Sequence, residues 1–157
     1  MSSRSIAQIL AVLPLLAGPA FAQDEAVTIM TAESEEHGTY LTDGEGHSVY
    51  LFEADTQGQG DTMPVMTCEG ECLENWPKVT TQGEPQASEG ADAEMLGTMT
   101  HDDGTMHVTY NGWPLYYYHE DTEPGDTKGH DIEEFGAEWY LLTPEGEEAG
   151  EEEEGES

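Results

Sequence analysis

Two segments of this chain have nearly the same sequence. Residues 47–62 read HSVYLFEADTQGQGDT and residues 113–127 read WPLYYYHEDTEPGDT. Three pairs of aligned positions lie 66 residues apart: Tyr50 and Tyr116, Phe52 and Tyr118, and Asp55 and Asp121. Trp76 and Trp139 form a further pair with a spacing of 63. Short insertions and deletions between the copies produce such a change from the spacing of 66. Because each copy of a repeat is one structural unit that stacks on its neighbour, this duplication constrains the architecture more than any single motif.

The residues in and around the two segments favour short strands. The strands expected in the first unit cover residues 39–42, 47–53 and 78–81, and those in the second cover residues 95–100, 106–110, 113–118 and 138–143. Gly-containing turns at residues 43–46 and 102–104, and Asn111-Gly112, indicate hairpins between them. Helical signals are confined to residues 72–76 and 131–135. The sequence therefore predicts an all-β fold, a small sandwich or barrel built from two hairpin-based internal repeats with pseudo-two-fold packing and little helix.

The two repeats define the expected domain organisation. Residues 1–22 are predicted to be a cleaved signal peptide, with Arg4 before a short apolar stretch and cleavage near Ala22. A flexible segment (residues 23–37) is expected next, followed by a single β-rich domain at residues 38–144. Within this domain the first repeat covers about 38–81, the linker about 82–93 and the second repeat about 94–144. Residues 145–157 are predicted to be a disordered acidic tail.

The composition and the leader together limit the compartment and the partners. The chain has 3 basic and 35 acidic residues and a formal net charge of −32. Such a charge repels nucleic acid and anionic membranes, so we expect inorganic cations at the surface and no nucleic-acid partner. The acidic excess is typical of a salt-adapted surface, and no cysteine for a lipid anchor lies near the expected cleavage site. We expect a periplasmic or secreted protein without a membrane anchor. The sequence leaves open whether it has a protein partner.

The chain resembles the bacterial secreted-repeat family of predicted lipoproteins with a Yx(FWY)xxD motif. The motif occurs twice, as Tyr50-Leu-Phe52-Glu-Ala-Asp55 and as Tyr116-Tyr-Tyr118-His-Glu-Asp121, and the resemblance covers about residues 38–144. CEGECLENWP and EPGDTKGHDIEEFGAEWYLL are further segments similar to the family. The resemblance implies no established activity. The chain departs from most members in lacking the lipid-anchor cysteine and in its large acidic excess.

The motif residues are expected to be structural. Each Asp follows a strand and precedes a Gly-containing loop, so Asp55 and Asp121 are predicted to cap turns by accepting backbone N–H groups. The motif tyrosines are expected to pack their rings in the core with Phe52 and to bond their hydroxyls to the backbone. The alternative is that the two aspartates form a shared carboxylate pair, as in enzymes that use two acidic groups.

Two further groups of residues could carry chemistry. Cys68 and Cys72, the only cysteines, predict a local disulfide in an oxidising compartment, although a reduced C-x3-C pair could hold copper. A soft-ligand group that suits copper lies within thirteen residues and consists of Met95, Met99, His101, Met106 and His107. The alternative is that the methionines fill the core while the histidines are solvated.

The sequence contains none of the nucleophile elbow, phosphate-loop, HExxH or dinucleotide-binding motifs. We therefore expect a non-catalytic exported module without a resident cofactor, involved in interaction or envelope stress. The first alternative is a periplasmic protein that binds or buffers copper, and the second is an enzyme that uses the paired aspartates.

Overall fold

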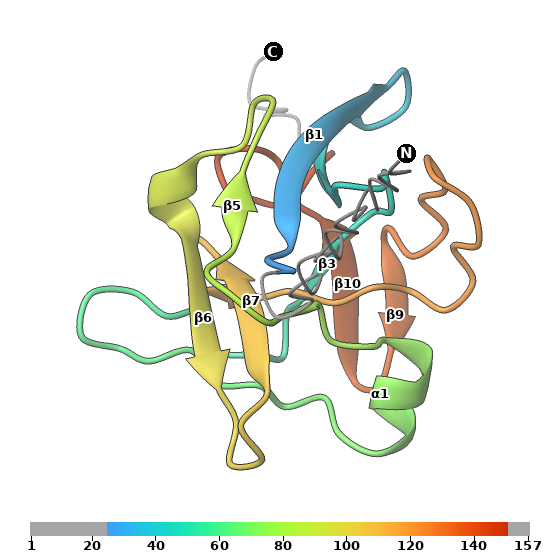
Figure 1. Ribbon diagram of the computed structural model, residues 1–157. Helices are drawn as coiled ribbons and strands as arrows, with labels where there is room; N and C mark the ends of the chain where they lie inside the picture. Colours follow the sequence, from blue (N-terminus) through green and yellow to red (C-terminus); the bar gives the residue numbers. More distant parts are fainter. Residues whose placement is uncertain (1–24, 151–157) are drawn as a thin grey trace, which may run out of the picture.

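The computed structural model describes residues 25–150 (Figure 1). The predicted signal peptide, its cleavage site and residues 151–157 of the predicted tail lie outside the described residues. The regular secondary structure of the described residues is almost entirely strands, arranged in three small sheets, which confirms the expected all-β class. Within residues 25–150, no helix is long and apolar enough to cross a membrane.

The first sheet contains the N-terminal strands. Antiparallel pairing joins β1 (Thr28–Ser34) to β2 (Gly38–Asp43), and β5 (Gln86–Ala87) adds to the other edge of β1 in parallel. β1 lies in the segment that was predicted to be flexible (residues 23–37), and β5 lies in the predicted linker (about 82–93). β1 forms because Ile29 is fully buried and because its backbone pairs with both neighbours.

The other two sheets lie on opposite sides of the molecule in Figure 1. One has the order β3-β10-β9, with β3 (Tyr50–Phe52) and β9 (Ile132–Glu134) flanking β10 (Ala137–Leu141). The last contains four strands: β4 (Thr80–Thr81), β6 (Leu96–Thr100), β7 (Met106–Tyr110) and β8 (Trp113–Pro114).

Two short helical segments connect the strands. α1 (Glu71–Asn75) lies where a helical turn was predicted, and the 3-10 segment η2 (Ala93–Met95) precedes β6. The helical turn predicted at residues 131–135 is wrong, because Ile132–Glu134 forms β9 and pairs with β10. Residues 145–150, which the sequence assigned to the disordered tail, are ordered, since Leu142 bridges Glu148 and Ala149 is 1% exposed.

The two repeats meet at the motif tyrosines. Tyr50 N donates to Tyr116 O at 2.8 Å, and Tyr116 N donates to Tyr50 O at 2.9 Å. These residues occupy equivalent positions in the repeats, so their reciprocal bonds mark an internal two-fold relation.

Aromatic rings fill the core beside this contact. Four rings stack in the order Phe52, Trp139, Trp76, Tyr118, alternating between the repeats. The centroids of successive rings lie 4.0, 3.9 and 4.2 Å apart. Tyr50 and Tyr116 add edge contacts to Trp76 and Trp139 at 5.5 and 5.2 Å. Each repeat therefore completes the aromatic core of the other, and such ring pairs stabilise a core beyond the area they bury.

The turn of each repeat also packs against a loop of the other. Gly58 N donates to Gly112 O at 2.9 Å, and Gly125 N donates to Gly46 O at 3.1 Å. Gly112 has φ +81°, and a Cβ placed there would lie 1.9 Å from Gly58 O. Glycine is therefore required at Gly112 by both backbone conformation and space.

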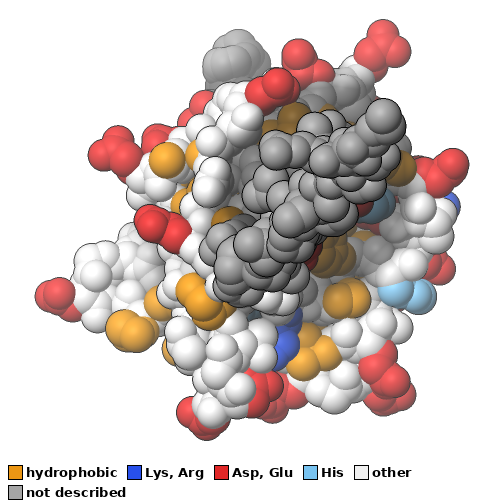
Figure 2. All heavy atoms as spheres, viewed as in Figure 1, with side chains coloured by type: hydrophobic (Ala, Val, Ile, Leu, Met, Phe, Trp, Pro, Cys, Tyr) orange, Lys and Arg blue, Asp and Glu red, His pale blue; other side chains and the backbone are white. Residues whose placement is uncertain are grey.

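The surface carries the acidic excess. On the face seen in Figure 2, Asp and Glu side chains are spread around the rim and few basic side chains are visible. Large apolar side chains are exposed among the described residues at Met63, Val65 and Phe135.

Candidate functional site

The polar groups of the repeated motif form hydrogen bonds across the repeat boundary. The Tyr50 hydroxyl donates to Asp121 Oδ2 at 2.5 Å, and the Tyr116 hydroxyl donates to Asp55 Oδ2 at 2.6 Å. Each tyrosine thus binds the aspartate of the other repeat, which differs from the backbone acceptor expected from the sequence. Hydrogen bonds to an ionised acceptor are stronger than neutral ones, so these two bonds fasten the repeats together.

The second carboxylate oxygen of each aspartate holds a loop. Asp55 Oδ1 accepts from the backbone N of Thr67 at 2.7 Å and from its hydroxyl at 2.9 Å. Asp121 Oδ1 accepts from the backbone N of Lys128 at 2.8 Å. The donors lie 12 and 7 residues further along the chain, so the aspartates anchor distant loop residues rather than a tight turn.

Burial governs the ionisation of these groups. It raises the pKa of Asp55 and of Asp121, and the hydrogen bonds they accept act in the opposite direction. The acidic group that acts on Asp121 is Asp126. Burial and the facing carboxylate also raise the pKa of Tyr50 and of Tyr116, so both hydroxyls stay protonated and keep donating. The two aspartates have separate sets of partners, as structural anchors do.

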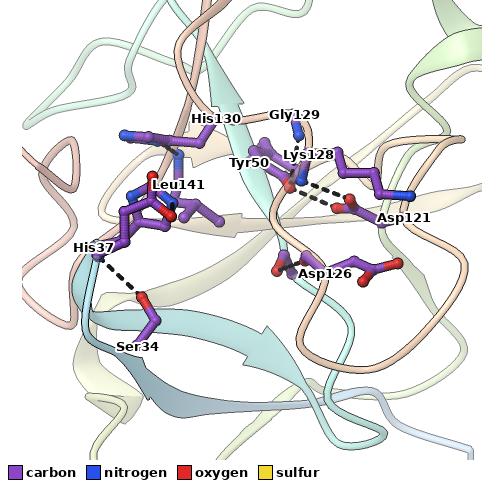
Figure 3. Close-up of polar contacts among 11 residues, drawn as sticks. Ser34, His37, Tyr50, Asp121, Asp126, Lys128, Gly129, His130 and Leu141 are labelled. Atoms are coloured by element: carbon purple, nitrogen blue, oxygen red, sulfur yellow. Dashed lines mark hydrogen bonds and ion pairs between the residues drawn. The ribbon is translucent and has the colours of Figure 1, made fainter.

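Figure 3 shows how the loop after Asp121 surrounds the Tyr50 hydroxyl. Besides donating to Asp121, this hydroxyl accepts from Gly129 N at 3.2 Å. A Cβ at Gly129 would lie 2.8 Å from the Trp76 ring, so the loop packs closely on the aromatic core.

Cys68 and Cys72 form the predicted disulfide, with their Cα atoms 5.3 Å apart. Cys72 lies in α1, and its carbonyl accepts from Trp76 N at 2.7 Å. The disulfide therefore secures the short helix that leads to a core tryptophan. Because both sulfurs are bonded to each other, neither is available as a thiolate ligand for copper in this state.

The strand register separates the five residues of the soft-ligand group. Met99 is the Cα partner of His107 across the β6–β7 pair, and His101 follows Met99 by two positions. Side chains alternate along a strand, so these three residues share one face. Met106 lies on the opposite face of the strand pair, where it lines a cavity together with Leu96. Met95 belongs to η2 and packs against buried apolar residues.

The two histidines of this face are in direct contact. His101 Nε2 lies 3.2 Å from His107 Nδ1, and the ring centroids are 5.3 Å apart. His107 Nε2 lies 2.7 Å from the carbonyl oxygen of Leu115, which can only accept, so we assign the His107 proton to Nε2. Nδ1 of His107 then carries a lone pair directed at His101.

Burial fixes the ionisation state of the inner histidine. His107 is 0% exposed, and desolvation lowers its pKa to about 4. His101 and Lys78 act on it in the same direction through their charge. His107 is therefore a neutral, oriented imidazole at physiological pH, while His101 and Met99 are half-buried beside it.

Sequence reasoning missed a second group of potential metal ligands. Ligand atoms of Asp43, Glu45 and His47 lie within 4.8 Å of one another in the turn after β2. Asp43 Oδ1 accepts from the backbone N of Glu45 and of His47, and Asp43 Oδ2 accepts from the Tyr117 hydroxyl. These hydrogen bonds explain the cluster as part of a turn that Asp43 stabilises. The sequence feature that could have indicated the group is the spacing of Asp43, Glu45 and His47 at every second position.

A further histidine pair was also missed. The rings of His37 and His130 meet edge to face with centroids 4.5 Å apart (Figure 3). His130 Nδ1 accepts from Leu141 N at 3.1 Å, and burial lowers its pKa. No sequence motif relates two residues so far apart, so this pair could not be found without the fold.

The chain matches a known protein family along most of its length. The family described as a secreted repeat of unknown function matches twice, at residues 30–80 and 97–143. The two matches correspond to the two halves that the motif tyrosines join. No curated protein and no solved structure shows significant similarity to the chain.

Proposed function

The chain belongs to a family of secreted repeats of unknown function, and from this premise we propose an exported, non-catalytic module that binds copper at His101 and His107. The observation that supports the proposal is the pair of imidazole nitrogens 3.2 Å apart, with the outer nitrogen of His107 bonded to a carbonyl oxygen. Metal-binding histidines usually donate their second N–H to such an acceptor, which fixes the ring and its tautomer.

The separation of the two nitrogens fits shared coordination. Two metal–nitrogen bonds of about 2.0 Å that end on atoms 3.2 Å apart enclose an angle of roughly 105°. In the tautomer of His101 that carries its proton on Nδ1, Nε2 supplies the second lone pair. His101 is only half-buried and can adopt that tautomer, whereas His107 is held in place by burial.

Met99 and Lys78 favour copper in its monovalent state. The Met99 side chain lies on the same face as the two histidines, and a thioether is a soft ligand that selects Cu(I). Lys78 is close enough to act on His107 through its charge, and it repels a monovalent ion less than a divalent one. The resulting donor set is two imidazoles and one thioether.

Motif residues support a non-catalytic role. Both motif tyrosines and both motif aspartates are engaged in bonds that hold the repeats and their loops together. These bonds use the groups that an enzyme built on the paired aspartates would need.

Titration with Cu(I) under a competing chelator tests the proposal. We expect His101→Ala to weaken Cu(I) binding at least about tenfold, since it removes one of two nitrogen ligands. Met99→Leu should weaken Cu(I) binding but leave Zn²⁺ binding unchanged. Met106→Leu and Met95→Leu are matched controls, because these methionines lie away from the shared face, and both should bind as the native chain does. Equal affinity in all four variants, or no binding by the native chain, would contradict the proposal.

A further inference from the structure

A cavity of about 860 Å³ lies away from the histidine pair, between the β1–β2 turn, the loop after β3, the β7–β8 turn and residues 143–150. None of the residues that line it belongs to the proposed copper site. Its use by a ligand would therefore be a separate property of the chain.

The walls of this cavity carry negative charge. Glu145, Glu147 and Glu148 line it together with His37, and none of the described residues that line it is a lysine or an arginine. The chain as a whole has a net charge of −32, which excludes an anionic ligand from such a site. A cation is the charged ligand that the cavity can attract.

An indole also lines the cavity. Trp113 is half-buried and packs partly against an apolar core cluster, whereas Trp76 and Trp139 are both 0% exposed. Among the described residues, no aromatic ring stacks on Trp113 or meets it edge to face. An indole face attracts ammonium groups, and quaternary ammonium groups above all.

Backbone-anchored amides complete the walls. Gln57 Nε2 donates to Asn111 O at 2.8 Å, and Asn111 Nδ2 donates to Gly146 O at 3.2 Å. These bonds hold three segments of the cavity in fixed positions, and the remaining amide groups can bond a polar part of a ligand.

The internal repeat provides a comparison for these residues. Trp113 and Asn111 lie 66 residues after His47 and Glu45, which occupy the equivalent turn of the first repeat. The repeat architecture therefore forms the turn without an indole. Trp113 is a feature of this one turn and of the cavity beside it.

We propose that this cavity binds an organic cation through an alkylammonium group, which contacts the face of Trp113 and is neutralised by the neighbouring carboxylates. The amides of Gln57 and Asn111 then face the polar remainder of the ligand. The site differs from a general counterion atmosphere because the indole favours an alkylated ammonium over an inorganic cation of equal charge.

Tryptophan fluorescence provides a specific test. The other two tryptophans are fully buried, so a ligand in the cavity should change the emission of Trp113. We expect tetramethylammonium chloride to produce a saturable change, and sodium chloride at equal ionic strength to produce none. Calorimetry with the same salts measures binding independently of the fluorophore.

Variants separate the proposed site from general charge. Trp113→Leu should weaken tetramethylammonium binding about two- to fivefold, the change expected for one exposed cation–π contact. Glu145→Gln/Glu147→Gln should weaken it as well, and Glu94→Gln/Glu123→Gln is the control with the same net charge and both changes outside the cavity. The two carboxylate variants alter exposed residues, so they test the site even if Trp113→Leu fails to fold.

Three results would overturn the proposal. One is an equal response to sodium and tetramethylammonium, which would show charge screening only. Another is equal weakening in the two double carboxylate variants. The third is saturable binding of a neutral sugar such as maltose without binding of tetramethylammonium, which would make the cavity a saccharide site.

Discussion

At the scale of single residues, the main finding is the exchange of partners between the two motifs. Tyr50 binds Asp121 and Tyr116 binds Asp55, so the tyrosine and the aspartate of each motif find their partners in the other copy. The motif positions could be identified in the sequence as structural. Their acceptors could not, because residues 61 and 71 positions apart are brought together only by the packing of the repeats.

A double-mutant cycle measures this exchange. Tyr116→Phe should lower the free energy of unfolding by about 1.5–3 kcal/mol, since it removes a buried hydrogen bond to a carboxylate. Combined with Asp55→Asn, the loss should be less than the sum of the two single losses, because both changes remove the same contact. Urea unfolding provides the free energies. The control is Tyr116→Phe with Asp121→Asn, whose effects should add, and additivity in both pairs would contradict the exchanged pairing.

At the scale of elements, local turn chemistry was predictable and long-range pairing was not. The Asn111-Gly112 hairpin and the β6–β7 hairpin lie where the sequence predicted them. β1 and β9 were missed because their pairing partners, rather than their own residues, make them strands. The same limit applies to the soft-ligand group, since strand alternation predicts that Met99 accompanies His101, but only the observed register shows that His107 rather than Met106 lies beside them.

The contact between the β7–β8 turn and the loop of the first repeat can be tested with two alanines. Gly104→Ala should cost about 1 kcal/mol, because Gly104 has φ +89° but open space around its Cβ position. Gly112→Ala has a similar φ and in addition would clash with Gly58 O, so it should cost substantially more. Thermal and urea unfolding of both variants give the comparison. Equal losses would mean that the turn does not need its close contact with the other repeat.

At the scale of the whole molecule, two similar halves share one aromatic core and one surface of high negative charge. The duplication and the all-β class could be predicted from the spacing of the aromatic residues, the aspartates and the turns, and the family followed from the resemblance of the repeated Yx(FWY)xxD motif. The ligand could not, because it depends on which side chains meet after the halves have packed.

The surface charge predicts a dependence of stability on salt. With 35 acidic and 3 basic residues, mutual repulsion should lower the melting temperature in dilute buffer. At ~1 M NaCl the Debye length falls to about 3 Å, so the melting temperature should rise steeply up to that concentration. KCl should act like NaCl if screening is the cause. A melting temperature that is flat across this range would contradict salt adaptation.

The most direct test of the proposed function is native mass spectrometry of the full protein isolated from the exported fraction of cells grown with copper. Each chain should carry one copper ion together with the intact Cys68–Cys72 disulfide. The His101→Ala variant should show the same disulfide and little or no copper, while Met106→Leu should keep the metal. A native chain without copper, or copper retained in full by His101→Ala, would contradict copper binding by the histidine pair.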